Sequence, residues 1–171
     1  MFDLILYEPQ IPPNTGNIIR LCANSGANLH LIEPLGFRLD EKSSRRAGLD
    51  YSDMATVQKW PDYQSYKKQH KKGQLWLVTK FGESCYSDVN FGKNDGFVFG
   101  SEQHGLPDEI IQSVPSHHRL YLPMQSGSRS LNLSNAVSII LYEAWRQNNF
   151  CGSFQTQWNE ACKLKQSYKL G

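Results

Sequence analysis

Short apolar segments alternate with longer amphipathic ones along this chain, and the alternation is typical of an α/β protein with a parallel sheet. The segment 75–79 is continuously apolar, as expected of a strand that is covered on both faces. Apolar segments of this kind predict strands at residues 4–7, 29–32, 75–79, 96–99 and 120–122.

The segments between the strands differ in how clearly their patterns predict a helix. A helix is predicted over residues 16–24, because three prolines in the preceding loop 8–15 oppose an earlier start. Gly26 should end this helix. The segment 132–147 predicts the strongest helix, whose apolar positions cover most of its circumference, so it should be deeply buried or meet a partner. Weaker helical patterns lie at residues 40–47, 62–72 and 107–114, of which 62–72 reads as a solvated, lysine-rich helix.

Length and composition indicate a soluble protein with one core. The chain has 171 residues, so we expect one domain over residues 1–150 and a polar segment, 151–171, without assigned structure. The N-terminus lacks the pattern of a signal peptide, and the apolar stretch 136–142 is too short to cross a membrane, so we expect a cytoplasmic protein. The four cysteines form no metal-binding pattern, and we expect no metal. The net charge is only +2, so a surface that binds nucleic acid must be a local basic patch or must be formed by oligomerisation.

Three polar, glycine-containing segments follow predicted strands, at residues 14–20, 99–106 and 122–136. Ligands of open α/β sheets bind at the carboxyl ends of the strands. In the first segment Asn14 can bind a polar substrate and Arg20 a phosphate, although a capped helix with an exposed arginine would look the same.

The second segment matches neither phosphate-binding fingerprint. Its Glu102 could bind ribose hydroxyls or assist a base, and His104 is either a general base or a surface residue. In the third segment a Gly/Ser-rich loop leads into the helix 132–147. Helix N-termini attract polar ligands, while Asn132 or Ser134 could simply cap the helix.

Together and in this order, the three segments resemble the three motifs of the SPOUT class of RNA methyltransferases. The run 6–17 with Arg20 is similar to the ribose-methylating branch. The runs 45–51 and 132–137 are similar to its minimal single-domain members, which act on the wobble cytidine or uridine of tRNA. The resemblance covers residues 1–150.

The resemblance implies a Rossmann-like parallel sheet with a C-terminal trefoil knot, a homodimer and tRNA as the partner. It also implies S-adenosylmethionine as the methyl donor, with S-adenosylhomocysteine as the product. Carried over position by position, the cofactor pocket would be formed by Val78, Thr79, Gly100, Leu122, Ser130, Leu131 and Asn132.

The implied reaction is attack of a ribose 2′-oxygen on the sulfonium methyl group. Arg20 is the catalytic residue that the resemblance implies, and because arginine stays protonated we expect it to stabilise the developing alkoxide. The adjacent phosphate or Glu102 would take the proton, and Asn14 and Asn132 would orient the ribose and the loops. Basic residues could form the RNA-binding rim, with a solvated helix face as the alternative for the lysines: Arg38, Lys42, Arg45, Arg46 and the lysines of 67–72.

Three other functions stay open on the sequence. The chain could methylate the 2′-hydroxyl of ribosomal RNA instead of tRNA. It could be a flavodoxin-like nucleotide-binding module without catalysis. It could also be an RNA-binding protein that keeps the pocket only for structure.

Overall fold

The computed structural model describes residues 1–39, 54, 57–70 and 72–154. Several predictions lie outside these residues: the helical pattern at 40–47, the run 45–51 with Arg45 and Arg46, Lys42, Lys71, and all of the C-terminal segment beyond residue 154. Within the described part of the chain, no helix has the length and apolar character needed to cross a membrane.

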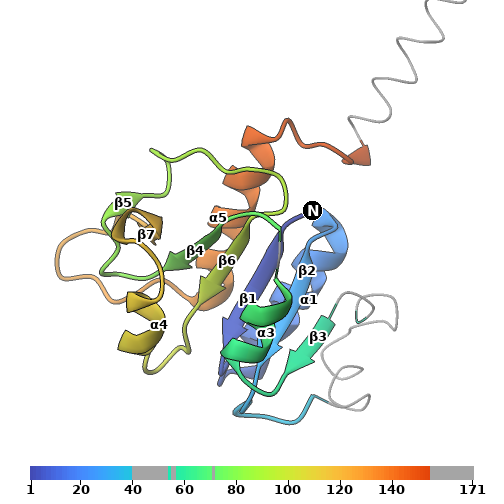
Figure 1. Cartoon of the computed structure of the whole chain (residues 1–171), viewed down its shortest axis with the longest axis vertical. Coiled ribbons are helices and arrows are strands. Elements are labelled where there is room, and N and C mark those ends of the chain that lie inside the picture. Colours follow the sequence, from blue (N-terminus) through green and yellow to red (C-terminus); the bar gives the residue numbers. More distant parts are fainter. Residues whose placement is uncertain (40–53, 55–56, 71, 155–171) are drawn as a thin grey trace, which may run out of the picture.

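A parallel sheet forms the centre of the fold (Figure 1). Its seven strands have the order β3-β2-β1-β6-β4-β7-β5, and all neighbouring strands pair in parallel. This confirms the predicted fold class. The strands are β1 (Asp3–Tyr7), β2 (Asn28–Ile32), β3 (Val57–Trp60), β4 (Leu75–Val78), β5 (Ser84–Cys85), β6 (Gly96–Phe99) and β7 (Arg119–Tyr121).

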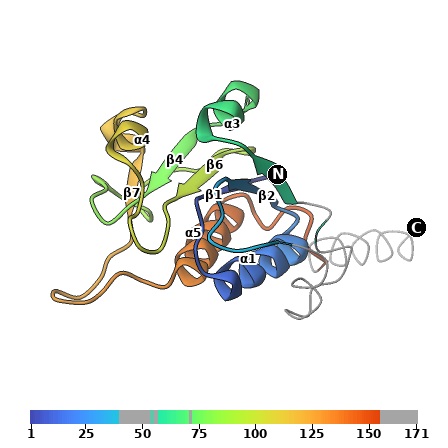
Figure 2. The same cartoon turned by 90° about the horizontal axis from the view of Figure 1, so that it is seen from below.

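Helices cover both faces of the sheet, as Figure 2 shows with α1 and α5 on one side and α3 and α4 on the other. The strands carry continuous apolar runs because successive side chains point to opposite faces, and here both faces are buried. In β1, Leu4 and Leu6 pack beneath α1 and α5, whereas Ile5 packs toward α3 and α4. The helices are α1 (Pro12–Ser25), α3 (Tyr63–Gln69), α4 (Asp108–Gln112) and α5 (Leu133–Gln147), with a 3₁₀ turn η2 (Ser116–His118).

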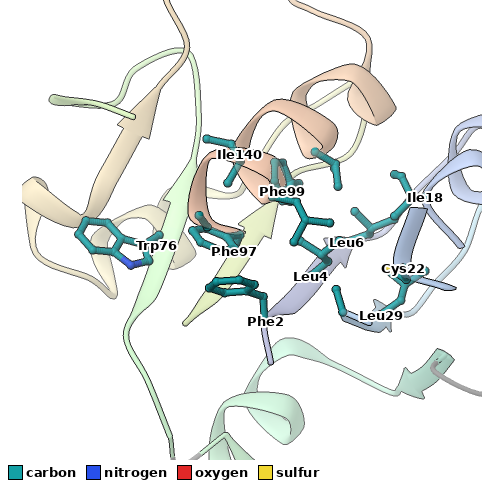
Figure 3. Packing of buried hydrophobic residues seen from close by; sticks show 14 of the residues in the cluster. Phe2, Leu4, Leu6, Ile18, Cys22, Leu29, Trp76, Phe97, Phe99 and Ile140 are labelled. Atoms are coloured by element: carbon teal, nitrogen blue, oxygen red, sulfur yellow. The ribbon is translucent and has the colours of Figure 1, made fainter. Parts of the chain in front are cut away.

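The larger of the two hydrophobic clusters joins α1 and α5 to the sheet (Figure 3). Ile18 and Cys22 of α1, Phe97 of β6 and Ile140 of α5 are all completely buried in it. This packing holds the two helix N-termini beside the carboxyl ends of the strands, where the candidate site lies.

The predicted start of the first helix was wrong. Helix α1 begins at Pro12, four residues earlier than expected, with Ile11 as its N-cap. Prolines are tolerated in the first turn of a helix, where their missing N–H would have no intrahelical partner. Asn14 therefore lies in the first turn of α1. The helix ends at Gly26 (φ 76°), as predicted.

The other helices follow the predictions with shorter bounds. Helix α5 is confirmed, and Asn132 caps it. The lysine-rich helix α3 ends at Gln69 and buries Tyr63 and Tyr66 against the sheet, so only part of it is solvated. Strands β3 and β5 had not been predicted, because β3 is largely exposed and β5 has only two residues.

Candidate active site

A pocket of about 560 Å³ opens at the carboxyl ends of β4, β6 and β7, beside the N-termini of α1 and α5. This volume is in the range of small-molecule sites. Val78 and Phe99 are the last residues of β4 and β6, and Leu122 directly follows β7. All of the residues predicted to bind the cofactor line this pocket: Val78, Thr79, Gly100, Leu122, Ser130, Leu131 and Asn132.

The loop after β6 forms one wall of the pocket and depends on two glycines. It closes on itself through two hydrogen bonds, in which the Ser101 and Gly105 N–H groups donate to each other's carbonyl oxygens at 3.1 and 2.9 Å. Gly105 has φ +71°, which favours glycine. A Cβ on Gly100 would lie 2.2 Å from the Gly105 carbonyl carbon, so no other residue fits without moving the loop.

This loop presents Glu102 to the N-terminus of α1. The Glu102 carboxylate accepts hydrogen bonds from the backbone N–H groups of Gln10 (2.8 Å) and Ile11 (3.3 Å). It also accepts one from Asn14 Nδ2 at 2.9 Å. Hydrogen bonds to an ionised acceptor are the strong ones, so Glu102 anchors the loop after β1 to the loop after β6.

Asn14 and Asn132 extend this contact to the third loop. Asn132 Nδ2 donates to Asn14 Oδ1 at 2.9 Å. Asn132 Oδ1 in turn accepts from the hydroxyl of Ser134 (2.7 Å) and from its N–H (3.0 Å), which caps α5. We call this series the Glu102–Asn14–Asn132 chain. It joins the three predicted motif segments at the pocket, and its central residue, Asn14, is only 5% exposed.

Three of the four predicted catalytic residues line the pocket, and the fourth does not. Asn14, Glu102 and Asn132 are brought together and line the pocket, and the oxygens of Glu102 accept hydrogen bonds from Asn14 in α1 and from the Gln10 N–H before the helix. Arg20 does not line the pocket; it is exposed on α1, six residues beyond Asn14. That spacing is about 9 Å along the helix axis at the usual rise per residue. His104 lies exposed at the pocket wall.

Several pocket residues were not predicted from the sequence. Ile11, Lys80, Phe81 and Met124 also line the pocket. Each follows a strand within a few residues, which is the one signal that could have found them. At the end of β1, burial together with the neighbouring Glu8 carboxylate raises the pKa of Tyr7 to about 12.

The fold and the site together define a parallel α/β protein with an open pocket of small-molecule size, bordered by three loops at the strand ends. Within the described residues, no group of three or more histidine, cysteine or carboxylate side chains is arranged to hold a metal ion. The chain belongs to the SpoU rRNA Methylase family, whose model matches residues 1–142. This confirms the resemblance to the SPOUT class.

Individual relatives agree with this assignment. The chain is 50% identical over 155 residues to a tRNA (cytidine(34)-2′-O)-methyltransferase from Aeromonas hydrophila, covering 91% of this chain and 99% of that one. A solved structure concerned with 2-OH methylation of C/U34 on tRNA superposes with a TM-score of 0.80 at 37% identity, covering 87% of this chain and 97% of that one. An AdoMet-bound rRNA methyltransferase from Sinorhizobium meliloti gives a TM-score of 0.72 at 25% identity, covering 85% of this chain and 56% of the other.

Proposed function

We propose that this protein transfers a methyl group from S-adenosylmethionine to the ribose 2′-hydroxyl of the wobble cytidine or uridine, nucleotide 34, of tRNA. One observation carries the proposal: the Glu102–Asn14–Asn132 chain joins all three motif segments around a pocket lined by the predicted cofactor residues. The choice of nucleotide is supported by relatives that cover about 90% of this chain and are named tRNA (cytidine(34)-2′-O)-methyltransferase, and uridine is included because of the solved structure concerned with C/U34.

The lining of the pocket fits S-adenosylmethionine better than a nucleoside triphosphate. Its walls are mainly apolar and neutral polar side chains such as Val78 and Thr79. The two carboxylates that also line it, Glu102 and Asp108, oppose a triphosphate, although Lys80 lies at the pocket as well. The pocket carries no phosphate-binding loop. Apolar walls with a few polar groups suit a purine nucleoside. When bound, S-adenosylmethionine supplies an electrophilic methyl group on a sulfonium.

The residues of this chain would then position the acceptor. Asn14 and Asn132 hold the loops around the reacting ribose through their mutual hydrogen bond. Both oxygens of Glu102 already accept hydrogen bonds, so we assign Glu102 to anchoring the loops and the proton to a phosphate oxygen of the bound RNA. Arg20 lies outside the pocket, so it would hold that phosphate, and its charge would act on the developing alkoxide through the phosphate and not by direct contact; this requires the RNA to extend from the pocket to the exposed side of α1.

A homodimer and a C-terminal trefoil knot belong to the same proposal. Helix α5 exposes Ile139 (37%) and Tyr142 (46%), and Phe150 (38%) follows it, which leaves an apolar surface for a second copy. The knot would involve the segment 122–132 and α5, within a domain of residues 1–150. The protein would act in the cytoplasm.

The dimer is tested by light scattering. The wild type should give the mass of two chains, and Ile139→Asp should give that of one. A wild-type monomer at micromolar concentration would contradict the dimer.

The substrate is tested with labelled S-adenosylmethionine and tRNA transcripts that carry a single 2′-deoxy nucleotide. Removing the 2′-oxygen at nucleotide 34 should stop incorporation, whereas the same change elsewhere in the anticodon loop should not. Undiminished incorporation into the first transcript would exclude this target. Incorporation only into ribosomal RNA would favour the alternative substrate, and cofactor binding without any transfer would favour a non-catalytic module.

A further inference from the structure

Phe81 is an exposed aromatic side chain at the mouth of the pocket. It is 73% exposed, and it lines the pocket immediately after β4. Three other large apolar side chains among the described residues share this position, Ile11, Met124 and Leu131, each 40–42% exposed. Phe81 is the aromatic member of this set and the most exposed, so it has a ring face to offer to a ligand.

The turn that carries Phe81 is held in place. The Phe81 N–H donates to Thr79 Oγ1 at 3.3 Å, and the Gly82 N–H donates to the Thr79 carbonyl at 3.2 Å. Gly82 packs directly on β7, because a Cβ there would lie 2.3 Å from the Leu120 carbonyl carbon. The exposure of Phe81 is therefore set by a turn docked on the sheet, and the ring is presented in a defined place.

A cation accompanies the ring. Lys80 Nζ lies over one face of the Phe81 ring, 4.8 Å from its centroid, which leaves the other face for a ligand. The Lys80 side chain is itself exposed at the pocket. A second exposed cation, Arg129, belongs to the segment 122–132 that forms another wall. An aromatic ring with a flanking cation matches an unpaired nucleotide, since bases stack on aromatic side chains while lysine and arginine contact phosphates.

We propose that Phe81 stacks on an unpaired base of the RNA substrate, next to the nucleotide whose ribose enters the pocket, while Lys80 contacts the adjoining phosphate. This inference rests on the proposed function and adds a base-stacking subsite to it. Stacking is tolerant of sequence because every base has a π-face. The subsite therefore selects an unstacked loop over a duplex without reading which base it holds.

The test uses the full-length protein and an anticodon stem-loop with 2-aminopurine beside the target nucleotide. Its fluorescence should be quenched by the wild type and by Phe81→Trp, and should stay unquenched with Phe81→Ala. We expect Phe81→Ala to weaken RNA binding about tenfold. The control Phe154→Ala removes a similarly exposed ring (70%) that does not line the pocket and should have no effect. Lys80→Ala should reduce the salt dependence of binding by about one counterion.

Each outcome has a defined meaning. Unchanged RNA binding by Phe81→Ala would overturn the stacking subsite, even if the wild type methylates tRNA normally. An equal loss of S-adenosylmethionine affinity, measured by calorimetry, would place Phe81 in the cofactor site instead. A change in mass by light scattering would make it a contact between protein chains. Quenching by a wild-type protein that transfers no methyl group would support the subsite while contradicting the proposed function.

Discussion

Replacing Asn14 tests whether the Glu102–Asn14–Asn132 chain holds the pocket together. Its side chain donates to the Glu102 carboxylate and accepts from Asn132, both at 2.9 Å. Asn14→Ala removes both bonds. A hydrogen bond to a charged group contributes about 2 kcal/mol and a neutral one about 1 kcal/mol, so the free energy of unfolding should fall by about 3 kcal/mol.

Asn14→Asp preserves size and the acceptor for Asn132 but turns the donor into a second carboxylate oxygen beside Glu102. At neutral pH this variant should be at least as unstable as Asn14→Ala. Two adjacent carboxylates raise the pKa of one of them, so the folded variant binds a proton that the unfolded chain releases above about pH 4. A raised folded-state pKa means that stability increases as the pH falls. The deficit of Asn14→Asp relative to wild type should therefore shrink between about pH 7 and about pH 5, and that of Asn14→Ala should not.

The assay is urea denaturation at both pH values, together with calorimetric titration of S-adenosylmethionine and a methyl-transfer rate. Asn28→Asp is the matched control, because Asn28 Nδ2 donates to the Asp3 carboxylate at the same 2.9 Å, in the register positions that open β2 and β1. This control should lose stability but bind the cofactor normally, whereas both Asn14 variants should bind it more weakly, because the loops around the pocket are no longer joined. Wild-type stability of Asn14→Asp at pH 7, or an equal loss of cofactor affinity in the control, would refute the reasoning.

Three further predictions concern the site and the amino ends of the strands, on the opposite side of the sheet from the pocket. Arg20→Ala should lower the transfer rate about 100-fold or more and leave cofactor affinity intact in calorimetry, and normal transfer would contradict its role. Gly100→Ala should abolish cofactor binding through its clash with the loop backbone, whereas Gly92→Ala, which lies away from the pocket and whose Cβ would have no contact shorter than 3.4 Å, should bind normally; equal affinities would refute this. Burial alone would raise the pKa of the Asp3 carboxyl, but contacts with His30, His70 and Asn28 outweigh it and hold this pKa well below its usual range. A lowered folded-state pKa contributes stability that is lost as the pH falls below about 4, so denaturation should show Asp3→Asn destabilised at pH 7 and approaching wild type in acid; a constant difference would contradict this.

Much of the fold could be predicted from local pattern. The continuous apolar runs predicted β1, β2, β4 and β6, because a strand that is buried on both faces is apolar at successive positions. The burial of α5 could also be predicted, because apolar positions cover most of the circumference of this helix. Strand β3 was missed because pairing at the edge of a sheet needs little burial, and the start of α1 was misplaced because prolines end some helices and begin others.

The candidate site, too, could be predicted from the sequence only in part. Which residues follow the strands is a property of the sequence, since order along the chain is enough to identify them. The sequence does not show which of these residues touch. Asn14 and Asn132 are 118 positions apart, and they meet only because two helix N-termini converge at the carboxyl ends of the strands. Tertiary structure alone decided that Glu102 accepts hydrogen bonds from α1, its cap and the residue before the cap, and that Arg20 lies outside the pocket. It also decided that a turn packed on β7 leaves Phe81 in solvent, since these facts depend on distances between segments that local pattern does not encode.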